Sequence, residues 1–139
     1  MTLKALIFDV DGTLANTERD GHLVAFNLAF EELDLDWVWS NELYHKLLDV
    51  TGGQLRIKHY VNDYKPDFSC DDLDAFAASV HALKTEIYVR LVNEGKIPLR
   101  PGVERLFHEA RDAGLRMAIA TTTTPANVDA LIANTLGRE

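Results

Sequence analysis

The sequence has 139 residues, 47% hydrophobic and 26% charged, and its 22 acidic against 14 basic residues give a formal net charge of −8. This composition is typical of one folded domain and excludes a disordered chain. The acidic balance, without a cluster of basic residues, argues against general binding to nucleic acid or to anionic membranes, so an anionic ligand would need a local binding device.

Cysteine usage and apolar runs indicate the compartment. The sequence contains one cysteine, Cys70, which excludes a disulfide within the chain and fits a reducing compartment. The residues after Met1 do not resemble a signal peptide, and no apolar run approaches the length of a membrane span. We therefore expect a cytoplasmic protein that does not bind membranes.

Apolar periodicity and end signals predict the elements in chain order. Residues 3–10 are mostly apolar without alternation, which is typical of a strand buried on both faces of a parallel sheet. Apolar residues at intervals of three and four predict a first helix over 17–33. Caps, glycines and prolines delimit the rest: helices at about 40–49, 54–64, 71–93 and 103–113, a strand over 115–120, and a last helix from Pro125.

This order predicts an α/β fold with an interrupted domain. Residues 1–14 and 96–139 form parts of one core with a parallel sheet, and residues 15–95 form an all-helical insertion. Such an insertion follows the carboxyl end of the first strand, where ligands bind in open α/β sheets. We therefore expect the insertion to cover a binding site.

Two carboxylates, Asp9 and Asp11, lie one residue apart at the end of the first predicted strand, in the segment FDVDGTLANTE. Side chains two residues apart on an extended segment face the same way. Two carboxylates placed so close together repel each other unless a cation bridges them or one of them is protonated. The pair could bind Mg²⁺, or act as nucleophile and general acid/base. The alternative is an acidic turn, because Asp and Gly favour turns.

Polar residues also follow the second predicted strand. Residues 121–124 are four threonines, and Pro125 opens the last helix directly after them. Hydroxyl groups at a helix N-terminus readily hold a phosphate group. Carboxylates and phosphate-binding hydroxyls at two strand ends are hard to explain as turn chemistry, and together they favour a catalytic site.

These segments carry a family resemblance. DVDGT resembles the first signature of the haloacid dehalogenase (HAD) superfamily of phosphotransferases, and MAIATTTT resembles the second. The segments DVDGTLANTERDGH, LLDVTGG and IATTTTPAN are similar to those of CbbY-type sugar-bisphosphate phosphatases within that superfamily. The resemblance implies part of a Rossmann-like core with an inserted helical cap.

The resemblance also implies a mechanism and a cofactor. Asp9 would be the nucleophile that forms an aspartyl phosphate, and Asp11 the general acid/base. The Asp9 carboxylate and the backbone carbonyl of Asp11 would hold Mg²⁺, while Thr121 and its neighbour Thr122 would bind the phosphoryl group. The implied substrate is a small sugar phosphate, with a pentulose bisphosphate expected.

Four residues of the insertion match positions that contact the sugar phosphate in this subfamily: Glu18, His22, Gly53 and Arg56. Alternatives remain open for three of them. Arg56 could be a solvated surface charge rather than a phosphate ligand. Glu18 and His22 are four residues apart on one helix face and could merely pair with each other.

The aromatic residues and the other histidines receive simpler interpretations. Aromatic residues of the insertion are expected to pack in a core and not to form a sugar platform; they are Phe26, Phe30, Trp37 and Trp39. The remaining histidines are expected at the surface; they are His45, His59, His81 and His108.

Two further family signatures have no counterpart among these residues. The third is a lysine, but no lysine follows Lys96; the fourth is acidic, but only Asp129 and Glu139 follow Thr121. We therefore expect the 139-residue chain alone to be inactive and to associate through an uncovered sheet edge. Two alternatives stay open: a remnant that only binds phosphate or a partner, and a phosphosugar mutase similar to β-phosphoglucomutase.

Overall fold

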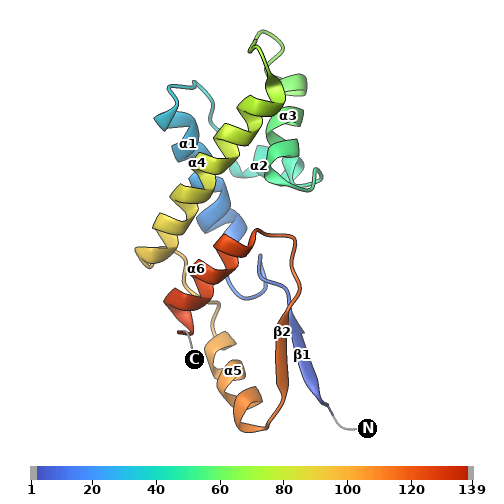
Figure 1. Cartoon of the computed structure of the whole chain (residues 1–139), viewed down its shortest axis with the longest axis vertical. Helices are drawn as coiled ribbons and strands as arrows, with labels where there is room; N and C mark the ends of the chain where they lie inside the picture. Colours follow the sequence, from blue (N-terminus) through green and yellow to red (C-terminus); the bar gives the residue numbers. More distant parts are fainter. Residues whose placement is uncertain (1–2, 138–139) are drawn as a thin grey trace.

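The computed structural model describes residues 3–137. Figure 1 shows an elongated molecule with helices at one end and a small sheet at the other. Its elements in chain order are β1 (Ala5–Phe8), the π-helical turn η1 (Glu18–His22), α1 (Leu23–Glu32), α2 (Asn41–Leu47), α3 (Gly53–Tyr64), α4 (Leu73–Asn93), α5 (Val103–Asp112), β2 (Arg116–Ile119) and α6 (Pro125–Thr135).

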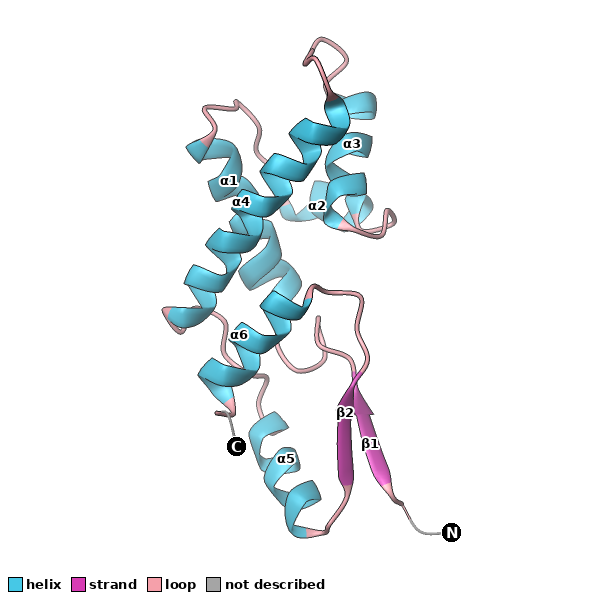
Figure 2. Cartoon of the chain, viewed as in Figure 1, coloured by secondary structure: helices cyan, strands magenta, loops and turns pink. Residues whose placement is uncertain are grey.

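The sheet confirms the predicted α/β class. Strands β1 and β2 pair in parallel, with Ala5 opposite Arg116 and Phe8 opposite Ile119. The connection between the parallel strands runs through the helical end and then α5, which leads directly into β2 (Figure 2). Phe107 of α5 stacks on Phe8 with ring centroids 4.7 Å apart, which fixes the helix against the sheet.

The expectation that the first strand is buried on both faces is wrong for this structure. Ile7 is 72% exposed, and all four residues of β2 are exposed. The physical reason is that α5 packs against one face, whereas the described residues place no layer on the other. Both strands are also shorter than the apolar runs that predicted them.

The helix boundaries largely confirm the end signals. Ser40 caps α2 by accepting a hydrogen bond from the Leu43 amide at 3.1 Å, and Asp72 caps α4 by accepting from the Ala75 amide at 3.0 Å. Pro125 occupies the first turn of α6, as expected from its fixed φ.

The first helix differs from its prediction as one regular helix. Residues 18–22 form a π-helical turn before α1, in which the Leu23 amide donates to the Glu18 carbonyl five residues earlier. Such turns widen a helix locally and often occur at functional sites. The turn carries Glu18 and His22, two of the predicted substrate-contacting residues.

The helical end has an aromatic core. Phe26, Phe30, Trp37 and Trp39 are buried together, and the Phe26 and Trp39 rings have centroids 4.7 Å apart. This arrangement confirms that these residues serve packing.

A second buried cluster lies between the two ends. It joins Val10 and Leu14 of the loop after β1 to Ile87 of α4 and Leu131 of α6. Helix α6 lies beside α4 (Figure 1), where Asn134 donates to Asn93 at 2.7 Å. The division into residues 1–14 with 96–139 and residues 15–95 stays a prediction. Among residues 3–137, no helix is long and apolar enough to cross a membrane.

Candidate active site

A cavity of about 290 Å³ lies where the helical end meets the loops that follow the strands. The loop after β1, the π-turn, the start of α3, the middle of α4 and the start of α6 all contribute to it. Its lining consists of Asp11, Glu18, His22, Gly52, Gly53, Gln54, Leu55, Arg56, His81, Lys84, Thr122, Thr123, Thr124 and Asn127.

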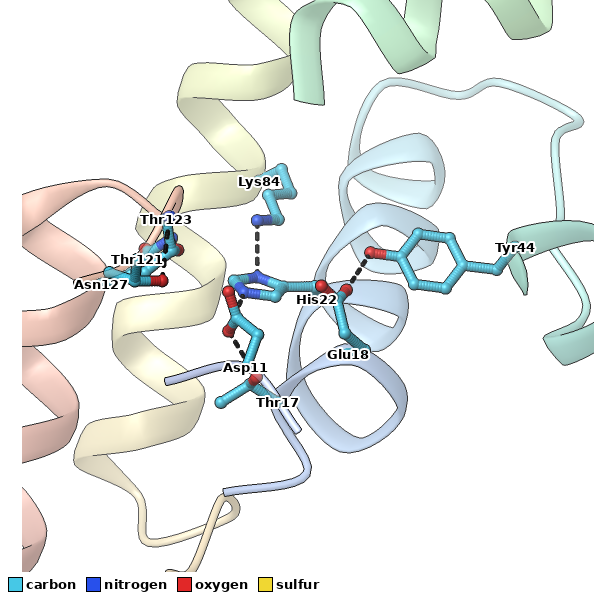
Figure 3. Close-up of polar contacts among 9 residues, drawn as sticks. All are labelled: Asp11, Thr17, Glu18, His22, Tyr44, Lys84, Thr121, Thr123 and Asn127. Atoms are coloured by element: carbon cyan, nitrogen blue, oxygen red, sulfur yellow. Dashed lines mark hydrogen bonds and ion pairs between the residues drawn. The ribbon is translucent and has the colours of Figure 1, made fainter. Parts of the chain in front are cut away.

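Asp11 is held in the cavity wall by two hydrogen bonds to one oxygen. Its Oδ1 accepts from the Thr17 hydroxyl and from His22 Nε2, the latter at 3.1 Å (Figure 3). Burial alone would raise the pKa of Asp11, but these hydrogen bonds, with the nearby positive charge of Lys84, outweigh it and lower the pKa. Asp11 is therefore an oriented carboxylate at neutral pH.

His22 connects Asp11 to Lys84. The Lys84 ammonium lies 2.8 Å from His22 Nδ1, and because an ammonium only donates, Nδ1 accepts and Nε2 carries the proton given to Asp11. His22 is 5% exposed and stacks on Tyr88 at 4.3 Å between centroids. Burial is the main reason that its pKa is lowered, which favours this neutral form.

Lys84 is a site residue that the sequence analysis missed. It is 4% exposed, and its Nζ lies 5.1 Å from the Phe26 ring centroid and 5.3 Å from that of Tyr88. Burial lowers its pKa to about 8. A signal was present, because Lys84 interrupts the apolar stripe formed by Ala77, Val80 and Ile87 on α4.

Glu18 does not pair with His22, so that alternative is wrong. Its Oε2 accepts a hydrogen bond from the Tyr44 hydroxyl at 2.7 Å. Burial, followed by the Glu18 charge, raises the pKa of Tyr44, so the phenol remains a donor. Tyr44 of α2 was also missed, and it orients Glu18 along the cavity wall.

Arg56 lines the cavity and also holds the chain around it. Its Nε donates to the Leu47 carbonyl and its Nη2 to the Val50 carbonyl, each at 3.1 Å. The guanidinium lies over the Tyr44 ring, 5.4 Å from the centroid. Arg56 is therefore not merely a solvated surface charge, and it joins the end of α2 to the start of α3.

Gly53 permits a close approach between α3 and α4. A Cβ at this position would lie 2.3 Å from Cδ2 of His81, so a side chain here would force the ring to move. The prediction of a surface position for His81 is wrong, since the residue lines the cavity and burial, then the Lys84 charge, lowers its pKa. The first residues of α3 line the same cavity, which places the positive end of a helix dipole at its wall.

The polar start of α6 closes the cavity. Thr121 Oγ1 accepts from the Thr123 amide at 3.3 Å, and Asn127 Nδ2 donates to Thr123 Oγ1 at 3.2 Å. Asn127 is 3% exposed, and within residues 3–137 its Oδ1 and the Thr124 hydroxyl have no hydrogen-bond partner. Burying polar atoms without hydrogen-bond partners costs free energy. This part of the cavity is therefore suited to hydrogen-bond a ligand or a water molecule.

Asp9 and Thr121 are absent from the described lining of the cavity. Asp9 is exposed at the end of β1, and the Ala120 amide donates to the Phe8 carbonyl at 2.9 Å, which brings both strand ends to one edge. Among residues 3–137, no group of three or more His, Cys, Asp or Glu side chains could hold a metal ion. Oxygen donors from Asp9 and Asp11 would thus supply only part of a coordination shell.

Comparisons with known proteins agree with this geometry. The family model of haloacid dehalogenase-like hydrolases matches residues 3–139. The CbbY proteins of Cupriavidus necator and Rhodobacter capsulatus are 52% and 51% identical, each over 99% of this chain. The chain spans only 54% and 59% of their respective lengths.

Solved structures give the same result. CbbY from Rhodobacter sphaeroides in complex with phosphate is 44% identical, with a TM-score of 0.86 over 99% of this chain and 59% of that chain. A mutant of that protein in complex with xylulose-1,5-bisphosphate is 43% identical, with a TM-score of 0.87 and the same coverage. Sequence signatures, parallel strands and family model together establish that this chain belongs to the haloacid dehalogenase-like hydrolases.

Proposed function

We propose that this chain is part of a Mg²⁺-dependent phosphatase that hydrolyses a small sugar phosphate, with a pentulose bisphosphate as its substrate. The observation that carries the proposal is the cavity beside Asp11, where Arg56, Lys84 and the amino end of α3 face an oriented carboxylate. An anion enters such a cavity despite the net charge of −8, because the positive groups are concentrated there. The complex of a similar CbbY protein with xylulose bisphosphate supports the substrate class.

The chemistry would proceed in two displacements. An Asp9 carboxylate oxygen attacks phosphorus, the bond from phosphorus to the sugar oxygen breaks, and Asp11 gives that oxygen a proton. Water then attacks phosphorus while Asp11 removes a proton from the water, the bond from phosphorus to the Asp9 oxygen breaks, and the Asp9 carboxylate is regenerated as inorganic phosphate leaves. Thr121 and Thr122 would donate hydrogen bonds to the phosphoryl oxygens.

The contacts of Asp11 fit the second displacement best. Thr17 and His22 both stabilise its ionised form, which is the form that takes a proton from water. For the first displacement Asp11 must carry a proton. The Lys84–His22–Asp11 contacts would therefore rearrange between the two steps.

The backbone of the same loop suits a cation. The Gly12 amide donates to the Ala15 carbonyl at 2.8 Å, and since the two polar groups of a trans peptide point in opposite directions, the Asp11 carbonyl points away from Ala15. Carbonyl and carboxylate oxygens are the donors that Mg²⁺ prefers. A bound Mg²⁺ would neutralise charge on the transferring phosphoryl group.

The remaining cavity groups would select the substrate. Arg56 and the amino end of α3 suit a second phosphate, whereas Glu18 and Asn127 offer acceptor oxygens to sugar hydroxyls. We expect the parent protein to supply the lysine and acidic groups of the third and fourth signatures. In the parent protein, we also expect further residues of the same polypeptide to cover the exposed edge and face of the sheet.

Phosphate release tests the proposal in the longest natural protein that contains this sequence. With Mg²⁺, we expect rapid release from xylulose bisphosphate and slower release from xylulose monophosphate and p-nitrophenyl phosphate. Equal rates on all three would contradict the second-phosphate site. Conversion of a sugar phosphate into its isomer without release of phosphate would show a mutase instead.

A further inference from the structure

Two linkers meet at the loop that carries Asp11. Residues 15–17 lead from the sheet to the first helix, and residues 94–102 return from α4 to α5. Ala15 forms isolated bridges with both Asp11 and Leu99, the latter antiparallel. The outgoing and returning linkers are therefore paired with each other next to the carboxylate.

Arg100 of the returning linker contacts this loop in two ways. Its backbone amide donates to the Leu14 carbonyl at 2.8 Å, and its Nη1 donates to the Gly12 carbonyl. The Arg100 side chain is otherwise exposed. Among residues 3–137, the Gly12 carbonyl is the only group to which this side chain donates a hydrogen bond. A long exposed side chain loses entropy when it is fixed, so this contact must offset that cost.

The Gly12 carbonyl is a sensitive place for such a contact. Gly12 has a φ of +74°, a left-handed conformation that allows the chain to turn directly after Asp11. The amides of Thr13 and Leu14 donate back to the Val10 carbonyl at 3.1 and 3.0 Å. Together with these bonds, the Arg100 contact fixes both sides of the peptide unit that joins Gly12 to Thr13.

We infer that Arg100 is a positioning residue, which holds the loop so that Asp11 keeps its place in the cavity. Because the returning linker starts at the end of α4, the contact also joins the orientation of the helices to the position of Asp11. This inference rests on the proposed function for its catalytic consequence. Arg100 lies outside the cavity lining, so its effect should fall on the reacting groups and not on substrate binding.

The test compares Arg100→Ala, Arg100→Lys and the control Arg105→Ala, in the longest natural protein that contains this sequence. Arg105 is an exposed residue of α5 whose Nε lies 3.4 Å from Oε1 of Glu109 on the same helix. We expect Arg100→Ala to lower kcat about 10- to 100-fold on sugar and aryl phosphates alike, with KM nearly unchanged. Arg100→Lys should recover part of the loss, because an ammonium can still donate to the carbonyl.

Amide hydrogen exchange gives a second readout. Exchange at Thr13 and Leu14 should become about tenfold faster in Arg100→Ala and stay unchanged in the control. Amides of α3 should exchange at the same rate in all variants, which distinguishes a local effect from loss of global stability.

Each outcome is decisive. Unchanged kcat in Arg100→Ala, a loss confined to KM, or a fall in kcat without faster loop exchange would overturn the inference. If the wild-type protein releases no phosphate, the proposed function fails. The amide exchange rates of Thr13 and Leu14 then decide by themselves whether Arg100 holds the loop.

Discussion

Replacing Lys84 by methionine is expected to stabilise the folded protein at neutral pH while weakening its binding of phosphate. Methionine has a similar length and no charge, so it fits among the Phe26 and Tyr88 rings. Lysine here is costly, because burial lowers its pKa from the ordinary value of 10.5 to about 8. The cation is thus kept at the expense of stability, as expected for a binding group.

The magnitude follows from proton linkage. At about 1.4 kcal/mol per pH unit, the cost of charging Lys84 in the folded state is about 3 kcal/mol at pH 7 and falls to about 1.4 kcal/mol at pH 9.5. Between pH 8 and 10.5 the unfolded chain binds more protons than the folded chain, so the free energy of unfolding rises with pH. Losing the bond to His22 offsets about 1 to 2 kcal/mol, and the net gain at pH 7 is about 1 to 2 kcal/mol.

Urea denaturation at pH 7 and pH 9.5 measures this effect. The advantage of Lys84→Met over the unchanged protein should shrink by about 2 kcal/mol between the two pH values. The matched control is Lys96→Met at an exposed linker position, which should show no such change. A Lys84→Met difference that is independent of pH would refute the reasoning, because it would mean that Lys84 carries no desolvation cost.

Three substitutions test the site further. Asp9→Asn should abolish phosphate release in the parent enzyme, since an amide cannot form the acyl phosphate, and unchanged release would exclude Asp9 as nucleophile. Arg56→Ala should raise KM for a bisphosphorylated sugar about 10- to 150-fold, the equivalent of about 1.5 to 3 kcal/mol of binding free energy, and far less for p-nitrophenyl phosphate; equal losses would assign Arg56 a purely structural role. Gly53→Ala should displace His81 and weaken phosphate binding measured by calorimetry, whereas Gly95→Ala, in open space and at a φ of +70° that Gly53 does not share, should leave binding intact.

Local signals predicted much of the fold. Ser40 and Asp72 act as helix caps, and the apolar spacings give helices close to those observed. The π-turn was not predictable from the spacing of apolar residues. A single hydrogen bond between residues five apart does not change that spacing enough to be recognised in a sequence. The exposure of Ile7 was also missed, since an apolar run indicates that a strand needs cover but not which layers are present.

The candidate site was likewise predicted only in part. The family resemblance predicted Asp11 and His22 as site residues, and both line one cavity, but it did not predict Lys84, which contacts His22. Lys84 could have been found from its place in an apolar stripe. The bonds from Arg56 to carbonyls of the preceding segment depend on how α2 packs against α3, which spacing does not reveal.

Covalent trapping tests the central claim most directly. The longest natural protein with this sequence is mixed with a pentulose bisphosphate and Mg²⁺, quenched in acid within one turnover and treated with borohydride, which converts an aspartyl phosphate to homoserine. Peptide mass spectrometry should then find homoserine at position 9 and aspartate at Asp11. Phosphate release without modification at Asp9, or modification at Asp11 instead, would contradict the account.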